Sequence, residues 1–177
     1  MEYSNTHREI VESCKRGNRS AQFELYRLYA KGMYSICLRM VKYELDAEDL
    51  LQNSFVDVFS KLDSFQYKSS IGAWIKRIVI NNCINFLKKR TLHFETLNDN
   101  GKLKVAEATV ERRELSVDKI NQAIFKLPTG YRVVFSLYLL EGYDHKEISD
   151  ILGITEATSK SQLSRAKRKV KEILTTG

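Results

Sequence analysis

A group of polar side chains near the end of the chain has the chemistry needed to read DNA. They share one face of a helix expected to begin after Thr155, and they are Lys160, Ser161, Gln162, Ser164, Arg165 and Arg168. Small hydroxyls permit a close approach to a major groove, glutamine and arginine offer donors to base edges, and lysine and arginine neutralise phosphates. An ordinary helical hairpin with a solvated basic face is the alternative interpretation. The short helix before this one and its own basic character favour DNA binding.

A second polar stripe lies in the middle of the chain. Arg77, Asn81, Asn85 and Lys88 are spaced i, i+4, i+8 and i+11, which places them on one face of a helix. The two amides suit the edges of an unpaired base, and the two cations suit phosphates. Neither asparagine has a local cap to make, which favours an external partner for both.

Three aromatic residues precede or begin this helix and are candidates for stacking on bases: Phe65, Tyr67 and Trp74. A core position is the alternative for Trp74, because it sits near the apolar stripe of the helix. The sequence alone favours the core position for this residue.

Carboxylates gather between residues 46 and 57 and raise the question of a metal or acid–base site. Helix capping accounts for Asp46 and Asp49, and no histidine cluster accompanies them. The three cysteines lie far apart, with no CxxC spacing, which indicates neither a zinc site nor a disulfide framework. We therefore predict no catalytic, cofactor-binding or metal-binding residue.

Charge is distributed in blocks along the chain. The 29 basic and 22 acidic residues give a net charge of +7. Residues 65–90 hold 6 basic and no acidic groups, residues 155–177 hold 6 against 2, and residues 46–64 hold 1 basic against 5 acidic. Two basic blocks on amphipathic helices favour a polyanionic partner over a merely solvated surface.

Composition restricts the fold class. A chain of 177 residues with 43% hydrophobic residues has enough apolar material to fold, and one proline with eight glycines leaves few breaks, which indicates an all-helical protein. No apolar run approaches the roughly 20 residues that span a bilayer, and the first eight residues have no apolar signal core. We expect a cytoplasmic protein without membrane insertion.

Periodicity predicts three helices in the first part of the chain. The apolar stripe of a helix over residues 20–41 consists of Phe23, Tyr26, Ala30, Met33, Cys37 and Met40. The next helix is expected to be capped by Asp46, with Leu45 and Leu50 as a hydrophobic staple. Its buried face would hold Leu51, Phe55, Val58 and Leu62, and its outward face Glu48, Asp49, Gln52, Asn53 and Asp57. A third helix should run from about residue 71 to residue 90.

The rest of the chain predicts a linker followed by a helix-turn-helix. Residues 91–116 are polar, with turn chemistry at 98–101 and a helical stretch near 110–115. Two helices follow, the first stopped at Pro128 and the second ended by Gly142. Asp144 with Glu147 should cap a short helix, Gly153 should supply its left-handed exit, and Thr155 should cap the last helix. The predicted fold is all-α, with two small helical domains, an N-terminal helical bundle (1–90) and a C-terminal four-helix helix-turn-helix domain (117–177), joined by a flexible linker (91–116).

Two stretches resemble conserved regions of bacterial RNA polymerase sigma factors. The run Asp46–Gln52, followed by Phe55, Val58, Phe59, Phe65, Trp74, Ile75, Arg77, Ile78 and Asn81, resembles their second region. The run Tyr143–Thr158, followed by residues 160–167, resembles their fourth region. The order of the two motifs and the short linker between them are typical of the extracytoplasmic-function (ECF) subfamily.

The resemblance implies a role for each group of residues. Contacts to the −35 element would come from Thr158, Lys160, Ser161, Gln162, Ser164, Arg165 and Arg168. Recognition and melting of the −10 element would fall to Phe65, Tyr67, Trp74, Arg77, Asn81, Asn85 and Lys88. Docking on core polymerase would fall to Asp46, Glu48, Asp49, Gln52, Asn53 and Asp57. Two positions depart from the commonest family pattern: Ser159 replaces an aliphatic residue, which should weaken packing, and Gln162 replaces an arginine, which favours adenine over guanine.

The implied partners are core RNA polymerase, duplex DNA at −35 and single-stranded DNA at −10. Family members are often held inactive by an anti-sigma protein, and nothing in the sequence shows such a partner here. One rival is a stand-alone helix-turn-helix regulator with an N-terminal sensing or dimerising domain, which would bind duplex DNA tightly without polymerase. A metal-dependent enzyme built on the 46–57 carboxylates ranks last.

Overall fold

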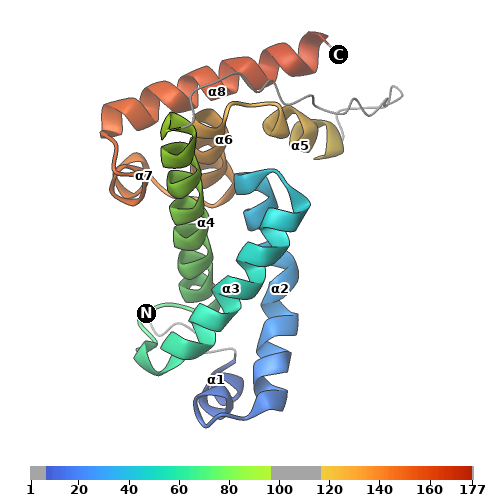
Figure 1. Ribbon diagram of the computed structural model, residues 1–177, viewed down its shortest axis with the longest axis vertical. Helices are drawn as coiled ribbons and strands as arrows, with labels where there is room; N and C mark the ends of the chain where they lie inside the picture. Colours follow the sequence, from blue (N-terminus) through green and yellow to red (C-terminus); the bar gives the residue numbers. More distant parts are fainter. Residues whose placement is uncertain (1–6, 97–116, 177) are drawn as a thin grey trace. The chain divides into compact units, whose positions relative to one another are not determined.

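The computed structural model describes residues 7–96 and 117–176, and every element in these ranges is helical (Figure 1). The chain divides into two compact units, Met1–Asn85 and Phe86–Gly177, and the division falls inside α4 (Ile71–Thr96). This helix continues through residues 91–96, which the sequence had assigned to the linker. The rest of that linker, with its predicted helical stretch at 110–115, lies outside the described residues. The exact boundaries 1–90, 91–116 and 117–177 stay a prediction.

The first unit is a helical bundle. α1 (Arg8–Lys15) packs on α2 (Arg19–Val41), and α2 forms a hairpin with α3 (Glu44–Lys61), which continues into a 3₁₀ turn, η1 (Leu62–Ser64) (Figure 1). The first part of α4 completes the bundle. Its core consists of fully buried apolar side chains from all four helices: Val11, Leu25, Met40, Val58, Ile75, Val79 and Ile80. α1 was not predicted from the sequence.

The predicted stripe of α2 is right at three of its six positions and wrong at one. Met33, Cys37 and Met40 are buried, but Phe23 is 66% exposed and Leu25 takes the core position instead. The two residues lie about 200° apart around a helix, so only one of them can face the bundle. The α2 N-terminus is capped by Asn18, whose side chain accepts a hydrogen bond from the Ala21 amide at 3.1 Å.

The predicted start of α3 is wrong. The helix begins at Glu44, and the Ala47 amide already donates to the Tyr43 carbonyl at 2.9 Å. Asp46 therefore lies inside the first turn rather than at the cap. Leu45 is 77% exposed, so the expected staple with Leu50 does not form. The predicted buried face of Leu51, Phe55, Val58 and Leu62 is confirmed.

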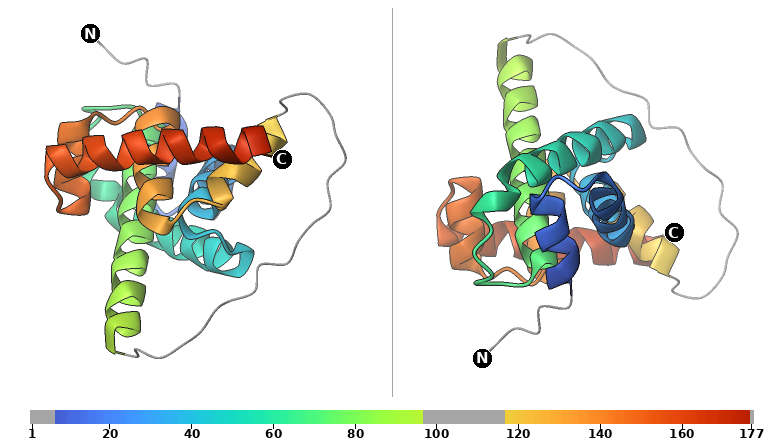
Figure 2. Two further views of the ribbon diagram at one scale, coloured as in Figure 1. Left: turned by 90° about the horizontal axis from the view of Figure 1, so that it is seen from above. Right: turned by 90° about the horizontal axis from the view of Figure 1, so that it is seen from below.

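In the second unit, the described residues form the end of α4 and four further helices. They are α5 (Val117–Phe125), α6 (Thr129–Phe135) with its π-helical continuation η2 (Ser136–Leu140), α7 (His145–Leu152) and α8 (Glu156–Thr176). α5, α6 and α7 all pack against α8, the longest of them (Figure 2). α5 ends shortly before Pro128, near the predicted stop. The buried Arg132 donates to the Leu127 carbonyl at 3.0 Å, which ties α6 to the segment that follows α5.

Within residues 7–96 and 117–176, no helix combines the length and the apolar character needed to cross a bilayer.

Candidate nucleic-acid interface

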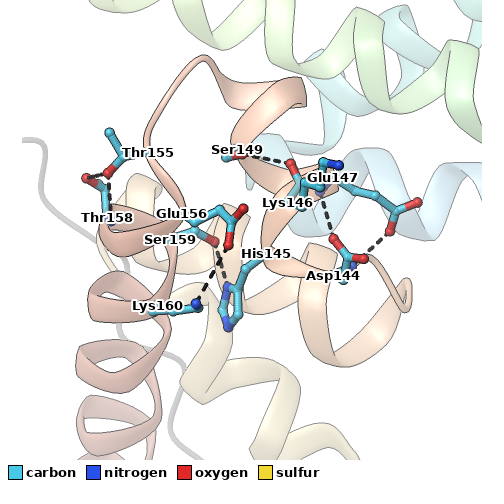
Figure 3. Close-up of polar contacts among 10 residues, drawn as sticks. All are labelled: Asp144, His145, Lys146, Glu147, Ser149, Thr155, Glu156, Thr158, Ser159 and Lys160. Carbon is cyan, nitrogen blue, oxygen red and sulfur yellow. Dashed lines mark hydrogen bonds and ion pairs between the residues drawn. The ribbon is translucent and has the colours of Figure 1, made fainter.

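The predicted helix-turn-helix is confirmed in its local geometry (Figure 3). The Asp144 carboxylate accepts from the Glu147 amide at 2.8 Å, and the Glu147 carboxylate accepts from the Asp144 amide at 2.9 Å. Gly153 leaves α7 with φ of 70°, a conformation that glycine adopts without steric cost. Thr155 then accepts from the Thr158 amide at 3.1 Å and caps α8. These contacts fix both ends of the turn.

One face of α8 is open to solvent and carries most of the predicted −35 residues. Exposed side chains on it are Lys160, Ser161, Ser164, Arg165 and Arg168. Lys160 pairs with Glu156 at 3.6 Å, and Arg168 pairs with Glu172 at 3.8 Å, all four side chains being at least half exposed. Exposed pairs of this kind contribute at most about 1 kcal/mol, so either cation can exchange its carboxylate for a phosphate at little cost.

Two predicted −35 residues lie differently. Gln162 is half-buried, and its amide oxygen is 3.7 Å from the position that a Cβ on Gly130 would occupy. Its side chain therefore packs beside the start of α6. Thr158 is half-buried as well, and its hydroxyl lies 2.9 Å from the Thr155 hydroxyl. Helical spacing placed Gln162 on the open face and the family resemblance added Thr158, but neither tells which neighbour a side chain meets.

Ser159 is completely buried, and its hydroxyl has a partner. The Nδ1 atom of His145 lies 2.9 Å from the Ser159 Oγ atom (Figure 3). The His145 ring also stacks on Tyr138, with ring centroids 4.5 Å apart. A hydrogen bond between α7 and α8 thus takes the place of the aliphatic contact, and the buried hydroxyl is satisfied. The expected weakening of the packing stays a prediction, and this bond adds a polar contact at the same position.

The polar stripe on α4 is exposed at all four predicted positions, Arg77, Asn81, Asn85 and Lys88. Asn82, one residue off the stripe, is used inside the bundle instead. Its Nδ2 atom donates to the Asp57 carboxylate at 2.9 Å and to the Ser54 hydroxyl at 3.2 Å. The contrast between internal and outward-facing asparagines on one helix agrees with an external partner for the stripe.

The three aromatic residues predicted to contact the −10 strand come together. The Phe65 ring lies 4.7 Å from Tyr67 and 5.3 Å from Trp74, centroid to centroid. Phe65 itself is only 4% exposed and forms the buried centre of the cluster. Tyr67 and Trp74 are half-buried, so each keeps part of its surface exposed to solvent.

The sequence missed the contacts that α1 makes with this cluster. The Tyr67 hydroxyl donates to the Glu12 carboxylate, and the Lys15 ammonium donates to the Phe65 carbonyl at 3.2 Å. Burial, followed by the bond to Glu12, raises the pKa of Tyr67 to about 12. The same bond lowers the pKa of Glu12. The spacing of Arg8, Glu12 and Lys15 at i, i+4 and i+7 was a signal for one helix face, but nothing in it pointed to a loop more than 50 residues away.

The outward face of α3 is acidic and partly apolar. Glu48, Asp49, Gln52 and Asn53 are exposed, as predicted. Leu45 and Val56, at 77% and 68% exposure, lie on the same face; Leu45 was expected in a staple with Leu50, and Val56 was not singled out from the sequence.

Two other predicted docking residues are less available to a partner, because they are partly buried or already make contacts within the bundle. Asp46 is half-buried, and the Asp57 carboxylate is held by Asn82 and lies 3.7 Å from the Lys61 ammonium. Among the described residues, no cluster of histidine, cysteine and carboxylate side chains could hold a metal ion.

Family models match both parts of the chain. Residues 25–92 match sigma-70 region 2, and residues 118–170 match sigma-70 region 4. The first match contains α3 and the α4 stripe, and the second contains the helix-turn-helix.

Curated relatives extend over nearly the whole chain. It is 28% identical to the ECF RNA polymerase sigma factor SigW of Bacillus subtilis over 93% of this chain and 94% of that protein. It is 29% identical to SigM of the same species over 87% of this chain and 95% of the relative. The ECF RNA polymerase sigma-E factor of Salmonella typhimurium is 26% identical over 93% and 92%.

Solved structures share the fold. The sigma factor RpoE bound to the anti-sigma factor NepR from Bartonella quintana matches with a TM-score of 0.62 and 23% identity, covering 86% of this chain and 95% of that one. CnrH in complex with the cytosolic domain of CnrY matches with a TM-score of 0.57 and 21% identity over 96% and 97%.

Proposed function

The chain belongs to the sigma-70 family of RNA polymerase sigma factors, in the ECF subfamily, and from this membership we propose how its surfaces divide the work of transcription initiation. It binds core RNA polymerase and directs it to particular promoters. Bond formation in the transcript belongs to the polymerase, and this chain supplies recognition and strand opening. The observation that carries the proposal is that each of the two matched regions presents an exposed cationic helix face, one on α4 and one on α8.

The open face of α8 reads the −35 element as duplex DNA. Its small hydroxyls at Ser161 and Ser164 allow close approach to the major groove, and Arg165 can reach base edges or phosphates. Lys160 and Arg168 exchange their surface ion pairs for phosphate contacts. Gln162 contributes by packing beside Gly130 at the start of α6.

The α4 stripe and the aromatic loop hold the −10 element as a single strand. Asn81 and Asn85 are placed to meet the edges of unpaired bases, while Arg77 and Lys88 neutralise the backbone. Tyr67 and Trp74 offer ring surface for stacking. Phe65 is a core residue whose ring packs against both of them.

The outward face of α3 docks on core polymerase. Glu48 and Asp49 complement a basic partner surface, and the exposed Leu45 and Val56 add apolar area at the same place. Asp57 contributes less to docking, because its carboxylate is already used by Asn82 and Lys61.

An anti-sigma protein is a further partner to test. RpoE and CnrH, which share the fold, were solved in complexes, the first with the anti-sigma factor NepR and the second with the cytosolic domain of CnrY. Affinity purification of the tagged chain from its native cells tests for one: co-purification of a stoichiometric small partner in place of polymerase supports an anti-sigma protein, and recovery of polymerase alone opposes it.

The proposed function is tested by capture and transcription. The tagged chain is mixed with core polymerase, the complex is isolated, and run-off transcripts are sequenced from a genomic fragment library. Stoichiometric capture and discrete start sites that depend on the chain support the proposal. Tight sequence-specific duplex binding by the chain alone, without capture of polymerase, would favour the stand-alone regulator.

A further inference from the structure

We propose that α1 positions the loop that meets the −10 strand, and that Glu12 is the residue through which it does so. The inference rests on the proposed function, because it assigns a role to residues around the aromatic cluster. Glu12 does not belong to the α4 stripe or to the aromatic cluster. It acts through Tyr67.

The backbone of the loop needs a restraint at Tyr67. This residue has φ of 59°, in the left-handed region that a bulky side chain rarely adopts. A tyrosine is held there only when its surroundings determine the conformation. The hydroxyl of Tyr67 supplies this restraint, because it donates to the Glu12 carboxylate on α1.

Two cations of α1 complete the clamp. The guanidinium of Arg8 lies 5.1 Å from the centroid of the Tyr67 ring, and the ammonium of Lys15 lies 4.9 Å from it. Lys15 also donates to the Phe65 carbonyl at 3.2 Å and lies 3.6 Å from Glu12. The α1 face that carries Arg8, Glu12 and Lys15 therefore holds the loop at two places, the side chain of Tyr67 and the backbone carbonyl of Phe65. We call these three residues the α1 clamp.

The clamp fixes what the DNA strand would meet. Because Phe65 contacts both Tyr67 and Trp74, a loop released from α1 would move the ring surfaces on which bases stack. A DNA strand that binds a released loop would have to order it again, and the free energy spent on this ordering would lower the affinity for the strand. The α3 face and the α8 face take no part in the clamp, so core docking and −35 binding should be unaffected.

The test compares five variants of the full chain, each assembled with core polymerase, for binding of a labelled non-template-strand oligonucleotide from a promoter that the transcription experiment has identified. Glu12→Ala and Tyr67→Phe should each weaken strand binding about tenfold, as expected for loss of a hydrogen bond to a charged group. The double variant should bind no more weakly than either single one, because both remove the same bond. Glu12→Gln keeps an acceptor oxygen and should retain binding within about threefold of the original chain. Glu9→Ala, an exposed acidic residue on the same helix, is the matched control.

Trp74 supplies a second readout in the free protein. It is the single tryptophan of the chain, and its ring packs on Phe65, so its emission reports the order of the cluster. Glu12→Ala should shift this emission, and Glu12→Gln should restore it. A merely structural role for Glu12 would instead lower the melting temperature and weaken strand, −35 and core binding together.

Several outcomes overturn the inference. They are equal strand binding by Glu12→Ala and Glu9→Ala, additive losses in the double variant, and a parallel loss of all three binding activities. Failure of the unaltered chain to bind core polymerase would instead overturn the proposed function, and it is visible before any variant is compared.

Discussion

Replacing Asn81 and Asn85 together by alanine should separate promoter opening from folding, and Asn82→Ala on the same helix should do the opposite. Asn81 and Asn85 are exposed, and alanine is the better helix former, so the double replacement should leave stability unchanged or raise it by about 1 kcal/mol. A well-placed amide contact to a base is worth about 1–3 kcal/mol. Loss of two such contacts should therefore reduce open-complex formation at least about tenfold.

Asn82→Ala removes bonds to the Asp57 carboxylate at 2.9 Å and to the buried Ser54 hydroxyl at 3.2 Å. For a half-buried side chain these two bonds together contribute about 2 kcal/mol. In a unit of this size the melting temperature should fall by roughly 10 °C. Because Asn82 points into the bundle, the folded variant should still open promoters below its melting temperature.

The assay is permanganate reactivity of unpaired thymines in the −10 region, with thermal melting and core binding measured on the same preparations. The expected pattern is low reactivity with normal melting for Asn81→Ala/Asn85→Ala, and normal reactivity with early melting for Asn82→Ala. Unchanged reactivity in the double variant would refute the assignment of the stripe. A melting loss in it as large as that of Asn82→Ala would refute the reading of these amides as outward-facing.

Three further predictions concern the other surfaces. Arg165→Ala should weaken binding to −35 duplex by at least about tenfold and leave core affinity unchanged. Lys171→Ala, the same charge change on α8, should leave both unchanged. Gel-shift measurement with the assembled holoenzyme checks both variants, and a drop in core affinity for Arg165→Ala would contradict the assignment. Reversing the charge at Glu48 and Asp49 should weaken core binding more at low salt than at high salt, and a salt-independent loss in a titration would point to misfolding instead. The pKa of Tyr67 is raised from 10.0 to about 12, so the folded protein favours the neutral phenol. The contribution of this neutral phenol to the free energy of unfolding should be complete below about pH 10 and disappear as the pH rises toward 12. Denaturation of the original chain and of Tyr67→Phe across that range measures it, and a stability difference that does not change with pH would contradict the prediction.

Local signals predicted the helix-turn-helix well. The Asp144–Glu147 capping box, the left-handed Gly153 and the Thr155 cap each depend on residues within a few positions of one another, and all three formed as expected. Such contacts depend on the backbone geometry of one turn, which the residue types at neighbouring positions determine.

The same kind of signal misplaced the start of α3, for a physical reason. A carboxylate stabilises a helix N-terminus either as the cap or from within the first turn, where it meets the positive end of the helix dipole. Asp46 takes the second position, with Glu44 beside it in the first turn. The acidic pattern therefore located the helix end to within a turn but could not choose the register.

Contacts between distant elements could not be predicted from spacing. The bond from Ser159 to His145 joins two helices, and the contact of Glu12 with Tyr67 joins residues 55 positions apart. Each contact depends on which helices pack together and at what height. The apolar pattern predicts only which face of each helix is buried. Nothing in the residue spacing of α1 placed its face against this loop.

Reconstituted transcription tests the central claim most directly. Core polymerase is supplied with a genomic fragment library, with and without the purified chain, and the 5′ ends of the transcripts are mapped. The account predicts discrete start sites that appear only with the chain and that share sequence elements upstream at both −10 and −35. A chain that leaves the transcripts of core polymerase unchanged, and that core polymerase does not retain, would contradict it.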